Sequence, residues 1–519
     1  MLSREQIISR HDAAWERQRG WGTVIEDAYR YAMPHREGDM RRAAGTNPVD
    51  LYDDTAVLSL PAGAGHLMMR ATPPFQKWFE IEGGPAMPQK EREGFNAAME
   101  PVTRAVQEVL HSGPSLSAFF EMYMDLFTGR GNLGIFPGDD TTPVVFTAVP
   151  RPSMAIENGA FGRVGGWFRN RTIHARQIDE EWSDARLTTF LVEAGEKDGE
   201  AGDVTLQEVT WWDKADQTFC YAVVCKDDKD GGLIVDRKYR RSPWITPRWE
   251  KMAGAHDGYG PLLKVLPTIR VVNKTVEMTL KNAALGLAGV YTAANDGVIN
   301  PATVRLVPSA VIPVASNGGP RGPSLMPLQT GRDVNLSQIV LQEARENIRR
   351  GLLDTRLPDT REAVKSPTEI FERVKEMNRD AGAGFGRLID EGLVPAVQRT
   401  MDVMADKGIL DLPDGFEIDG LFSRVRVTSQ LAQVQKVEEV ERVINWLTVQ
   451  QQMLGREAMM LGARVEDIPA LLADDMDVPS RYVRDAKSRQ GLQQMIAQMI
   501  AQGQQEQLGQ AGAVAGLDE

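Results

Sequence analysis

The sequence contains few of the residues from which catalytic and metal sites are built. Its six histidines are scattered between positions 11 and 256, and none has the spacing of a metal ligand relative to another histidine or to a cysteine. No Gly-Lys dipeptide is followed by Ser or Thr, so an ordinary P-loop is missing. No nucleophile elbow occurs either. We therefore interpret the chain as a non-enzymatic protein and expect no catalytic residue, no cofactor and no metal site.

Cysteine is scarce as well. The two cysteines, Cys220 and Cys225, begin and end the run Cys-Tyr-Ala-Val-Val-Cys, which has the composition of a β-strand. Their odd spacing places them on opposite faces of such a strand, so they cannot form a disulfide with each other. We expect two buried, reduced thiols in a cytosolic protein.

The chain also lacks an excess of basic residues and any long hydrophobic run. It has 59 Lys and Arg residues against 72 Asp and Glu residues, which gives a net charge of −13. Tight DNA binding depends on many cationic contacts with phosphates, so this composition argues against a DNA-binding domain of the usual kind. The longest weakly polar stretch, 283–294, is too short to span a bilayer, and residues 1–20 are charged throughout. We expect synthesis in the cytoplasm and no membrane partner.

Regular apolar patterns fill most of the chain. Helical spacing predicts helices at 1–35, 50–69, 90–110, 115–127 and 368–404, and in much of the C-terminal third. Short β-rich runs separated by Gly and Asp clusters occupy 143–240, and a further strand is expected at 424–428. The most informative feature is a pair of long helices, 261–289 and 335–353, on either side of the insert 290–334. That insert contains six prolines, which exclude a long helix.

The run Gly129-Arg-Gly-Asn-Leu-Gly134 matches the dinucleotide-binding fingerprint in its letters. That fingerprint works only between a strand and a helix, whose N-terminus then holds a pyrophosphate. Here an expected helix precedes the run, and Ile135-Phe-Pro-Gly138 follows it. The context therefore indicates a glycine-rich turn.

Short motifs along the chain form a second pattern. In chain order they are Leu51-Tyr-Asp-Asp-Thr-Ala56, Ala71-Thr-Pro-Pro74, Lys77-Trp-Phe79, Tyr239-Arg-Arg-Ser-Pro-Trp244, Pro247-Arg-Trp249, Tyr259-Gly260, Leu266-Pro267, Thr368-Glu-Ile370 with Arg373, Leu388, Glu391, Pro395, Ser429–Gln435, Asp477–Pro479 and the basic run Arg481–Arg489. Together and in this order they resemble the head-to-tail connector (portal) family of short-tailed, podovirus-like bacteriophages. The chain departs from the family pattern where Tyr259-Gly260 runs directly into Pro261, and where Leu353-Asp-Thr-Arg356 replaces an acidic-aromatic turn.

The resemblance implies an α+β portal-protein fold, mainly α-helical, with a β-rich wing and a small β clip, assembled as a ring with a central channel. The implied regions are the wing (1–255), first stem helix (256–289), clip (290–334), second stem helix (335–353), tunnel loop (354–367), a wing/crown-connecting helix and strand (368–430) and the C-terminal crown (431–519). Because the clip cannot hold a core of its own, we expect its strands to pair between neighbouring subunits.

The resemblance also implies function and partners. The chain would form a homo-oligomer, usually a dodecamer, at the portal vertex of the capsid in the virion, and double-stranded DNA would pass through its channel during packaging and ejection. The implied partners are the terminase large subunit during packaging, the tail adaptor protein that replaces it, and the capsid and scaffold proteins. An acidic channel wall would keep the duplex hydrated and mobile.

Charged residues of the stem and tunnel loop are the candidate DNA-facing groups. At about 100° per residue, Arg270, Lys274 and Lys281 form one narrow stripe on the first stem helix. They either face the channel or pair with acidic residues of an adjacent helix such as Glu343 or Glu346. Arg356, Arg361 and Lys365 are the candidates in the tunnel loop. A separate apolar stripe, which we expect to pack against neighbours, consists of Val276, Leu280, Ala283 and Leu287.

Two other classes of protein compete with this interpretation. One is another virion structural protein, such as a scaffold or tail adaptor. Those proteins are commonly shorter and do not have two long helices around a proline-rich insert. The other is a cytosolic enzyme that binds a nucleotide at the glycine-rich turn, which the missing strand and the missing catalytic set argue against.

Overall fold

The computed structural model describes part of the chain in two units. The described residues are 2–36, 51–228, 231–288, 291–293, 325–327, 334–354, 386–410, 412, 420–428, 443–446, 448–449 and 452. Residues 1–427 form one compact unit, and residues 428–519 form a second. The first unit contains both helices and sheets, in agreement with the expected α+β class. None of the helices described is both long enough and apolar enough to cross a membrane.

The N-terminal segment forms two helices. A capping box begins α1 (Arg4–Arg19), in which the Ser3 hydroxyl accepts from the backbone of Gln6 while the Gln6 side chain accepts from the backbone of Ser3. The chain turns at Gly20, and α2 (Gly22–Ala32) and a short 3₁₀ turn, η1 (Pro34–Arg36), follow. The expectation of one helix over 1–35 was therefore wrong. The physical reason is that α1 buries its apolar face on the large sheet, whereas α2 buries its face in the helical core.

A five-stranded antiparallel sheet forms the β-rich part. Its order is β4-β5-β6-β7-β8, made of β4 (Met154–Asn158), β5 (Val164–His174), β6 (Asp203–Asp213), β7 (Thr218–Cys225) and β8 (Val235–Tyr239). Two short helices, α6 (Gln177–Glu181) and α7 (Thr189–Gly195), cover one face, and α1 covers the other. Cys225 lies in the core beneath α6 and α7, and Cys220 lies in the core beneath α1. The prediction of buried thiols on opposite faces is confirmed.

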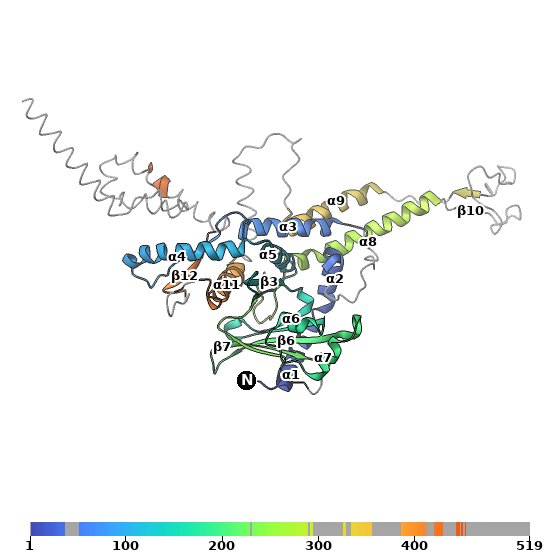
Figure 1. The fold of residues 1–519 in the computed structure, drawn as a ribbon. Helices are drawn as coiled ribbons and strands as arrows, with labels where there is room; N and C mark the ends of the chain where they lie inside the picture. The colour runs from blue at the N-terminus through green and yellow to red at the C-terminus, as the bar shows by residue number, and fades with distance from the viewer. Residues whose placement is uncertain are drawn as a thin grey trace, which may run out of the picture. The chain divides into compact units, whose positions relative to one another are not determined.

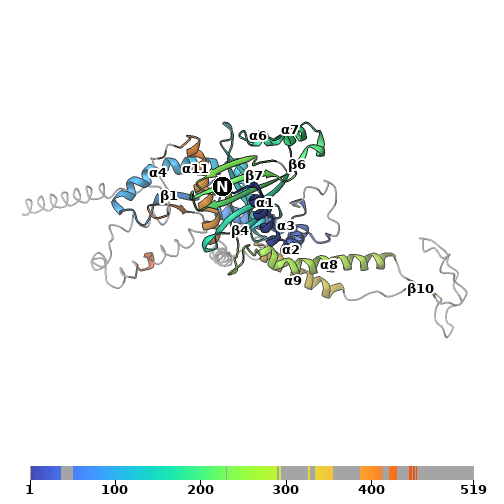
Figure 2. The same ribbon diagram turned by 90° about the horizontal axis from the view of Figure 1, so that it is seen from below.

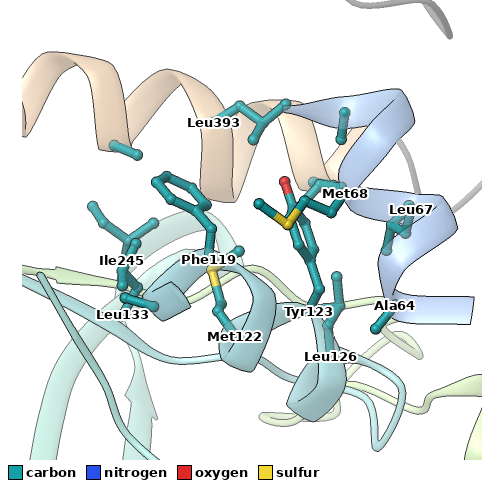
Figure 3. Close-up of a cluster of buried hydrophobic side chains, with 14 of the residues drawn as sticks. Ala64, Leu67, Met68, Phe119, Met122, Tyr123, Leu126, Leu133, Ile245 and Leu393 are labelled. Atoms are coloured by element: carbon teal, nitrogen blue, oxygen red, sulfur yellow. The ribbon is translucent and has the colours of Figure 1, made fainter. Parts of the chain in front are cut away.

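A second layer is mainly helical. It contains α3 (Thr55–Ala71), α4 (Gln89–Leu110), α5 (Gly113–Leu126), the π-helical turn η5 (Ile389–Leu393) and α11 (Val394–Asp406). Two small sheets join it: β3-β2-β9, of Val144–Ala148, Leu133–Pro137 and Trp244–Ile245, and β1-β12, of Phe79–Gly83 and Ser423–Val427. Figure 3 shows its core, where Phe119, Met122 and Tyr123 of α5 gather with Leu67 of α3 and Leu393 of η5.

The two long helices leave this layer as an antiparallel pair. They are α8 (Pro261–Ala288) and α9 (Val334–Gly351), which run side by side in Figures 1 and 2. Beyond the end of α8, β10 (Tyr291–Ala293) pairs antiparallel with β11 (Leu325–Pro327) of the same chain. The other residues of the insert, including the strand-like runs 304–307 and 311–312, lie outside the described residues. The proposed pairing between subunits is therefore not tested there.

Pro267 lies inside α8 without interrupting it. Proline lacks the N–H that would bond to the carbonyl four residues earlier, which here is the carbonyl of Leu263. That oxygen accepts a hydrogen bond from the Tyr259 hydroxyl at 3.3 Å instead. The tyrosine of the Tyr259-Gly260 motif thereby replaces the missing backbone donor and lets the helix continue.

Candidate functional site: the stem pair and its root

The segment before α3 fastens both helices of the stem pair, which we define as α8 and α9. Asn273 of α8 accepts hydrogen bonds from the backbone N–H groups of Tyr52 at 2.7 Å and Asp53 at 3.1 Å. The carboxylate of Asp53 accepts from Nη2 of Arg345 in α9 at 2.7 Å and from its Nε at 2.9 Å. Because Asp53 and Asn273 are buried, these polar contacts position the two helices with little freedom.

The end of α9 packs closely on α3. Gly63 of α3 lies against the carbonyl oxygen of Leu352, so near that a Cβ atom would come within 1.9 Å of it. Asp354 accepts from the Ser59 hydroxyl at 2.8 Å. Asp354 begins the region expected to be the tunnel loop. Its first residue is therefore held by α3, while Arg356, Arg361 and Lys365 lie outside the described residues.

The beginning of α8 rests on the glycine-rich turn. The N–H of Leu262, which has no partner inside its own helix, donates to the carbonyl of Phe127 at the end of α5 at 2.9 Å. Gly129 has φ +122°, and a Cβ atom there would lie 2.2 Å from the carbonyl oxygen of Gly258. Gly260 approaches Phe127 as closely. A helix precedes the glycine run and a strand follows it, which confirms the turn and excludes the dinucleotide-binding arrangement. The glycines serve close backbone packing at the root of the stem pair.

A set of buried charges surrounds this root, and we call it the arginine junction: Arg130, Arg151, Arg248, Asp257 and Glu391. One oxygen of Asp257 lies 3.3 Å from Nη1 of Arg130 and 3.0 Å from Nη2 of Arg151. Burial alone would raise the pKa of Asp257, but the two guanidinium groups outweigh it and hold the pKa below its ordinary value. Burial lowers the pKa of Arg130 to about 10, against the opposing effect of Asp257.

Arg248 makes the second half of the arginine junction. Its Nη2 and Nε donate to the two oxygens of Glu391 at 2.6 and 2.9 Å, and its backbone N–H donates at 3.2 Å. This two-pronged geometry is the strongest form of an arginine–carboxylate pair. Glu391 stands in the π-helical turn η5, so the pair joins that turn to the segment before α8. Two of the motifs that carry the family resemblance, Pro247-Arg-Trp249 and Glu391, thus meet in space.

The three cations of the α8 stripe pair within the unit. Arg270 pairs with Asp27 of α2, and both Lys274 and Lys281 pair with Glu277 of their own helix. Lys281 and Lys274 hold the pKa of Glu277 below its ordinary value. All three cationic side chains remain exposed, at 44%, 60% and 68%. Exposed pairs of this kind contribute little to stability, which leaves the groups able to meet another charge.

Sequence reasoning missed the arginine junction. Arg130 lies inside the glycine-rich run and follows a strongly apolar helix, which is the only local hint that its side chain is buried. The members of the junction come from positions up to 261 residues apart, and the direct pair of Arg248 with Glu391 spans 143 residues, a separation that no periodic pattern signals. No group of three or more His, Cys, Asp and Glu side chains with metal-site geometry occurs among the residues described.

Comparison with known proteins places this fold among structural proteins of the virion. A family model described as bacteriophage head to tail connecting protein matches residues 4–483, which include every element described above. The chain belongs to this family, and the expected resemblance is confirmed.

Other comparisons add little. No curated protein is similar enough to count as a match. A solved structure, from the virion of a native gene transfer agent particle, is 14% identical. The likeness covers 78% of this chain and 90% of that chain with a TM-score of 0.31, which is too low to support an argument.

Proposed function

We propose that this chain is the portal subunit of its virion. A ring of copies, a dodecamer in this proposal, stands at one capsid vertex and surrounds a channel for double-stranded DNA. The terminase large subunit docks on the clip during packaging, the tail adaptor protein replaces it, and capsid and scaffold proteins hold the ring's outer surface. Membership of the head-to-tail connecting family supports a role at this place in the particle.

The observation that carries the proposal is the rooted stem pair. Two antiparallel helices extend from a compact unit, end in a small strand pair, and are fixed at their root by ion pairs in which one partner is buried and the other is partly exposed. Because the root is fixed in this way, the stem pair would not bend there, and it would hold the clip at a constant position relative to the wing. The tunnel loop would follow directly from Asp354, next to the wall that α8 and α9 would form.

An exposed apolar pair on α8 supports assembly with other copies. Val271 and Met278 are 63% and 59% exposed. Seven residues separate them, so at about 100° per residue they lie about 20° apart on the helix surface. Ile269, which is buried in the unit, lies about 160° from Val271. Near its root, α8 is therefore fixed to its own unit on the side of Ile269, while the opposite side offers apolar surface to a neighbour.

Electron microscopy of the purified full-length chain tests the proposal. We expect closed rings with a central hole, because head-to-tail contacts between identical subunits close when the rotation per subunit divides a full turn. Rotational averaging then gives the number of subunits. A monodisperse monomer or an open filament under all assembly conditions would contradict the portal assignment.

The exposed cations of α8 give a second prediction. Changing Arg270, Lys274 and Lys281 to Gln should leave rings intact, since exposed ion pairs stabilise folded proteins only weakly. If the stripe faces the channel, the rate of DNA packaging or the retention of packaged DNA should change. In vitro packaging and a nuclease-protection assay measure the two effects.

Lys264→Gln is the matched control. Lys264 lies on the same helix, is 47% exposed and pairs with Glu250 at 2.7 Å. It lies about 120° from Arg270 around the helix. We expect this variant to package and retain DNA like the parent. A triple variant that behaves as the control does would refute the channel-facing role, and a triple variant that forms no rings would assign the stripe to contacts between subunits.

A further inference from the structure

A pocket opens beside the arginine junction, at the corner between α1 and α2. Its volume is about 280 Å³, at the low end of the range for small-molecule sites. It is lined by Arg17, Gln18, Trp21, Arg130, Ile156, Ala255, His256 and Asp257. The lining joins the α1–α2 corner, strand β4 and the segment that leads into α8.

The floor of the pocket carries more positive than negative charge. Arg130 is fully buried, as is Arg151 behind it, and the two share the single carboxylate of Asp257. Nε of Arg130 is buried and has no hydrogen-bond partner among the described residues. A buried guanidinium that is only half compensated is costly, because desolvation penalises the charge and each unpaired donor adds to the cost. An anion in the pocket would compensate the buried charge and accept a hydrogen bond from the unpaired donor.

Two further hydrogen-bond donors line the pocket, the guanidinium of Arg17 and the ring of His256. Arg17 is 42% exposed, and its nearest carboxylate, on Glu157, lies 3.7 Å away, beyond hydrogen-bonding distance. The other oxygen of that carboxylate accepts a hydrogen bond from Nε of Arg10 at 2.8 Å. The guanidinium of Arg17 therefore retains donors for a ligand.

The tautomer of His256 follows from its neighbours. Asn158 Oδ1 accepts from Nη1 of Arg248 at 3.4 Å, and arginine can only donate. The Asn158 amide nitrogen must then face His256, whose Nδ1 lies 3.1 Å away and accepts. In the neutral ring the proton is consequently on Nε2. His256 thus offers a donor at its other nitrogen, and Asn158 holds the ring in that state.

We propose that this pocket, which we call the corner pocket, binds a phosphate group, carried either by free inorganic phosphate or by a small phosphate monoester. A phosphate is a compact acceptor with two negative charges and several oxygens. The corner pocket supplies guanidinium donors from Arg17 and Arg130 and an imidazole donor from His256. Asp257 does not oppose binding strongly, because Arg130 and Arg151 neutralise it.

A phosphate bound in the corner pocket would connect parts of the molecule that are far apart in the sequence. Helix α1 packs on the large sheet, and the residues after Asp257 lead directly into α8. A bound phosphate held by Arg17 and His256 would link these two parts. The free energy of unfolding would then increase with phosphate concentration, because a ligand that binds only the folded state stabilises it.

Isothermal titration calorimetry on the full-length protein tests the proposal, with inorganic phosphate and AMP as separate probes at constant ionic strength. Arg17→Gln removes one charge-assisted donor and should weaken binding by about ten-fold. His256→Ala should weaken it in the same direction. Arg19→Gln is the matched control, because Arg19 lies on the same helix, is 78% exposed and pairs with Glu16 at 2.9 Å. It should bind like the parent.

The two probes distinguish the source of the phosphate. Binding of both probes that depends on Arg17 supports the site, and the tighter probe identifies the ligand class. Binding of inorganic phosphate alone that depends on Arg17 also supports it and excludes an ester. The proposal is overturned if neither probe binds, or if Arg17→Gln and Arg19→Gln bind equally. These results do not depend on whether the chain forms a ring, so a failure here leaves the portal assignment intact.

Discussion

Asp257→Asn should lower the free energy of unfolding of the first unit by about 3–5 kcal/mol, the usual cost of removing one partner from a buried ion pair. Asparagine keeps the shape of the side chain, so no cavity is created. It removes the carboxylate that Arg130 and Arg151 share among the described residues, so each of these fully buried guanidinium groups loses that ion pair. Urea unfolding followed by tryptophan fluorescence measures the change.

Asp216→Asn is the control for that variant. Asp216 pairs with Lys238 at 2.5 Å, but both side chains are more than 40% exposed, so solvent screens the pair and we expect little change. The pH dependence gives a second readout. Because the pKa of Asp257 is depressed in the folded state, its contribution is present above the unfolded pKa and is lost as pH falls through the folded value. The loss of stability that protonation of Asp257 causes at low pH should therefore be absent in Asp257→Asn. Equal stability of the two variants would contradict the role of the arginine junction.

Introducing charge on the exposed apolar side of α8 should abolish rings without unfolding the subunit. Val271→Glu with Met278→Glu places two carboxylates on surface that we expect a neighbouring copy to cover. Burying them there would require desolvating like charges in every contact of the ring. The unit's own core should be unaffected, because both side chains are exposed in the single chain. Light scattering after size exclusion measures the mass, and circular dichroism measures the fold.

Val192→Glu provides the comparison for the assembly prediction. Val192 is 47% exposed on α7, which packs on the large sheet, so the same substitution introduces the same charge away from the stem pair. We expect that variant to assemble like the parent. Rings of normal mass from the double α8 variant would show that this side of the helix is not a contact between subunits.

The helices and the large sheet could be predicted because their patterns are local. The spacing of apolar residues placed α4, α5, α8 and α9 within a few residues of their observed ends, and alternation placed Cys220 and Cys225 on opposite faces. The boundary at α3 was less accurate. A helix from residue 50 was expected, but α3 begins at Thr55 because Tyr52 and Asp53 are held by Asn273 instead.

The arginine junction could not be predicted, since its one local hint, the apolar helix before Arg130, does not indicate which residues are the partners. Arg130, Arg151 and Arg248 look like surface residues in sequence, and only the fold brings Asp257 and Glu391 to them. The error at 1–35 has a similar origin. Whether a helical pattern continues past Gly20 depends on which core each half packs against, and that is a property of the tertiary structure.

The pairing of β1 with β12 has a consequence for synthesis of the protein. Gly83 pairs with Ser423, so 339 residues, including the whole stem pair and the insert, must be translated between the two strands. At ribosomal rates of roughly 5–20 residues per second, β1 waits for tens of seconds as an unpaired strand edge. The unit cannot close on the ribosome before nearly all of its chain has emerged. Nascent subunits are therefore most exposed to aggregation during this interval, and a chain shortened before residue 423 leaves β1 permanently open.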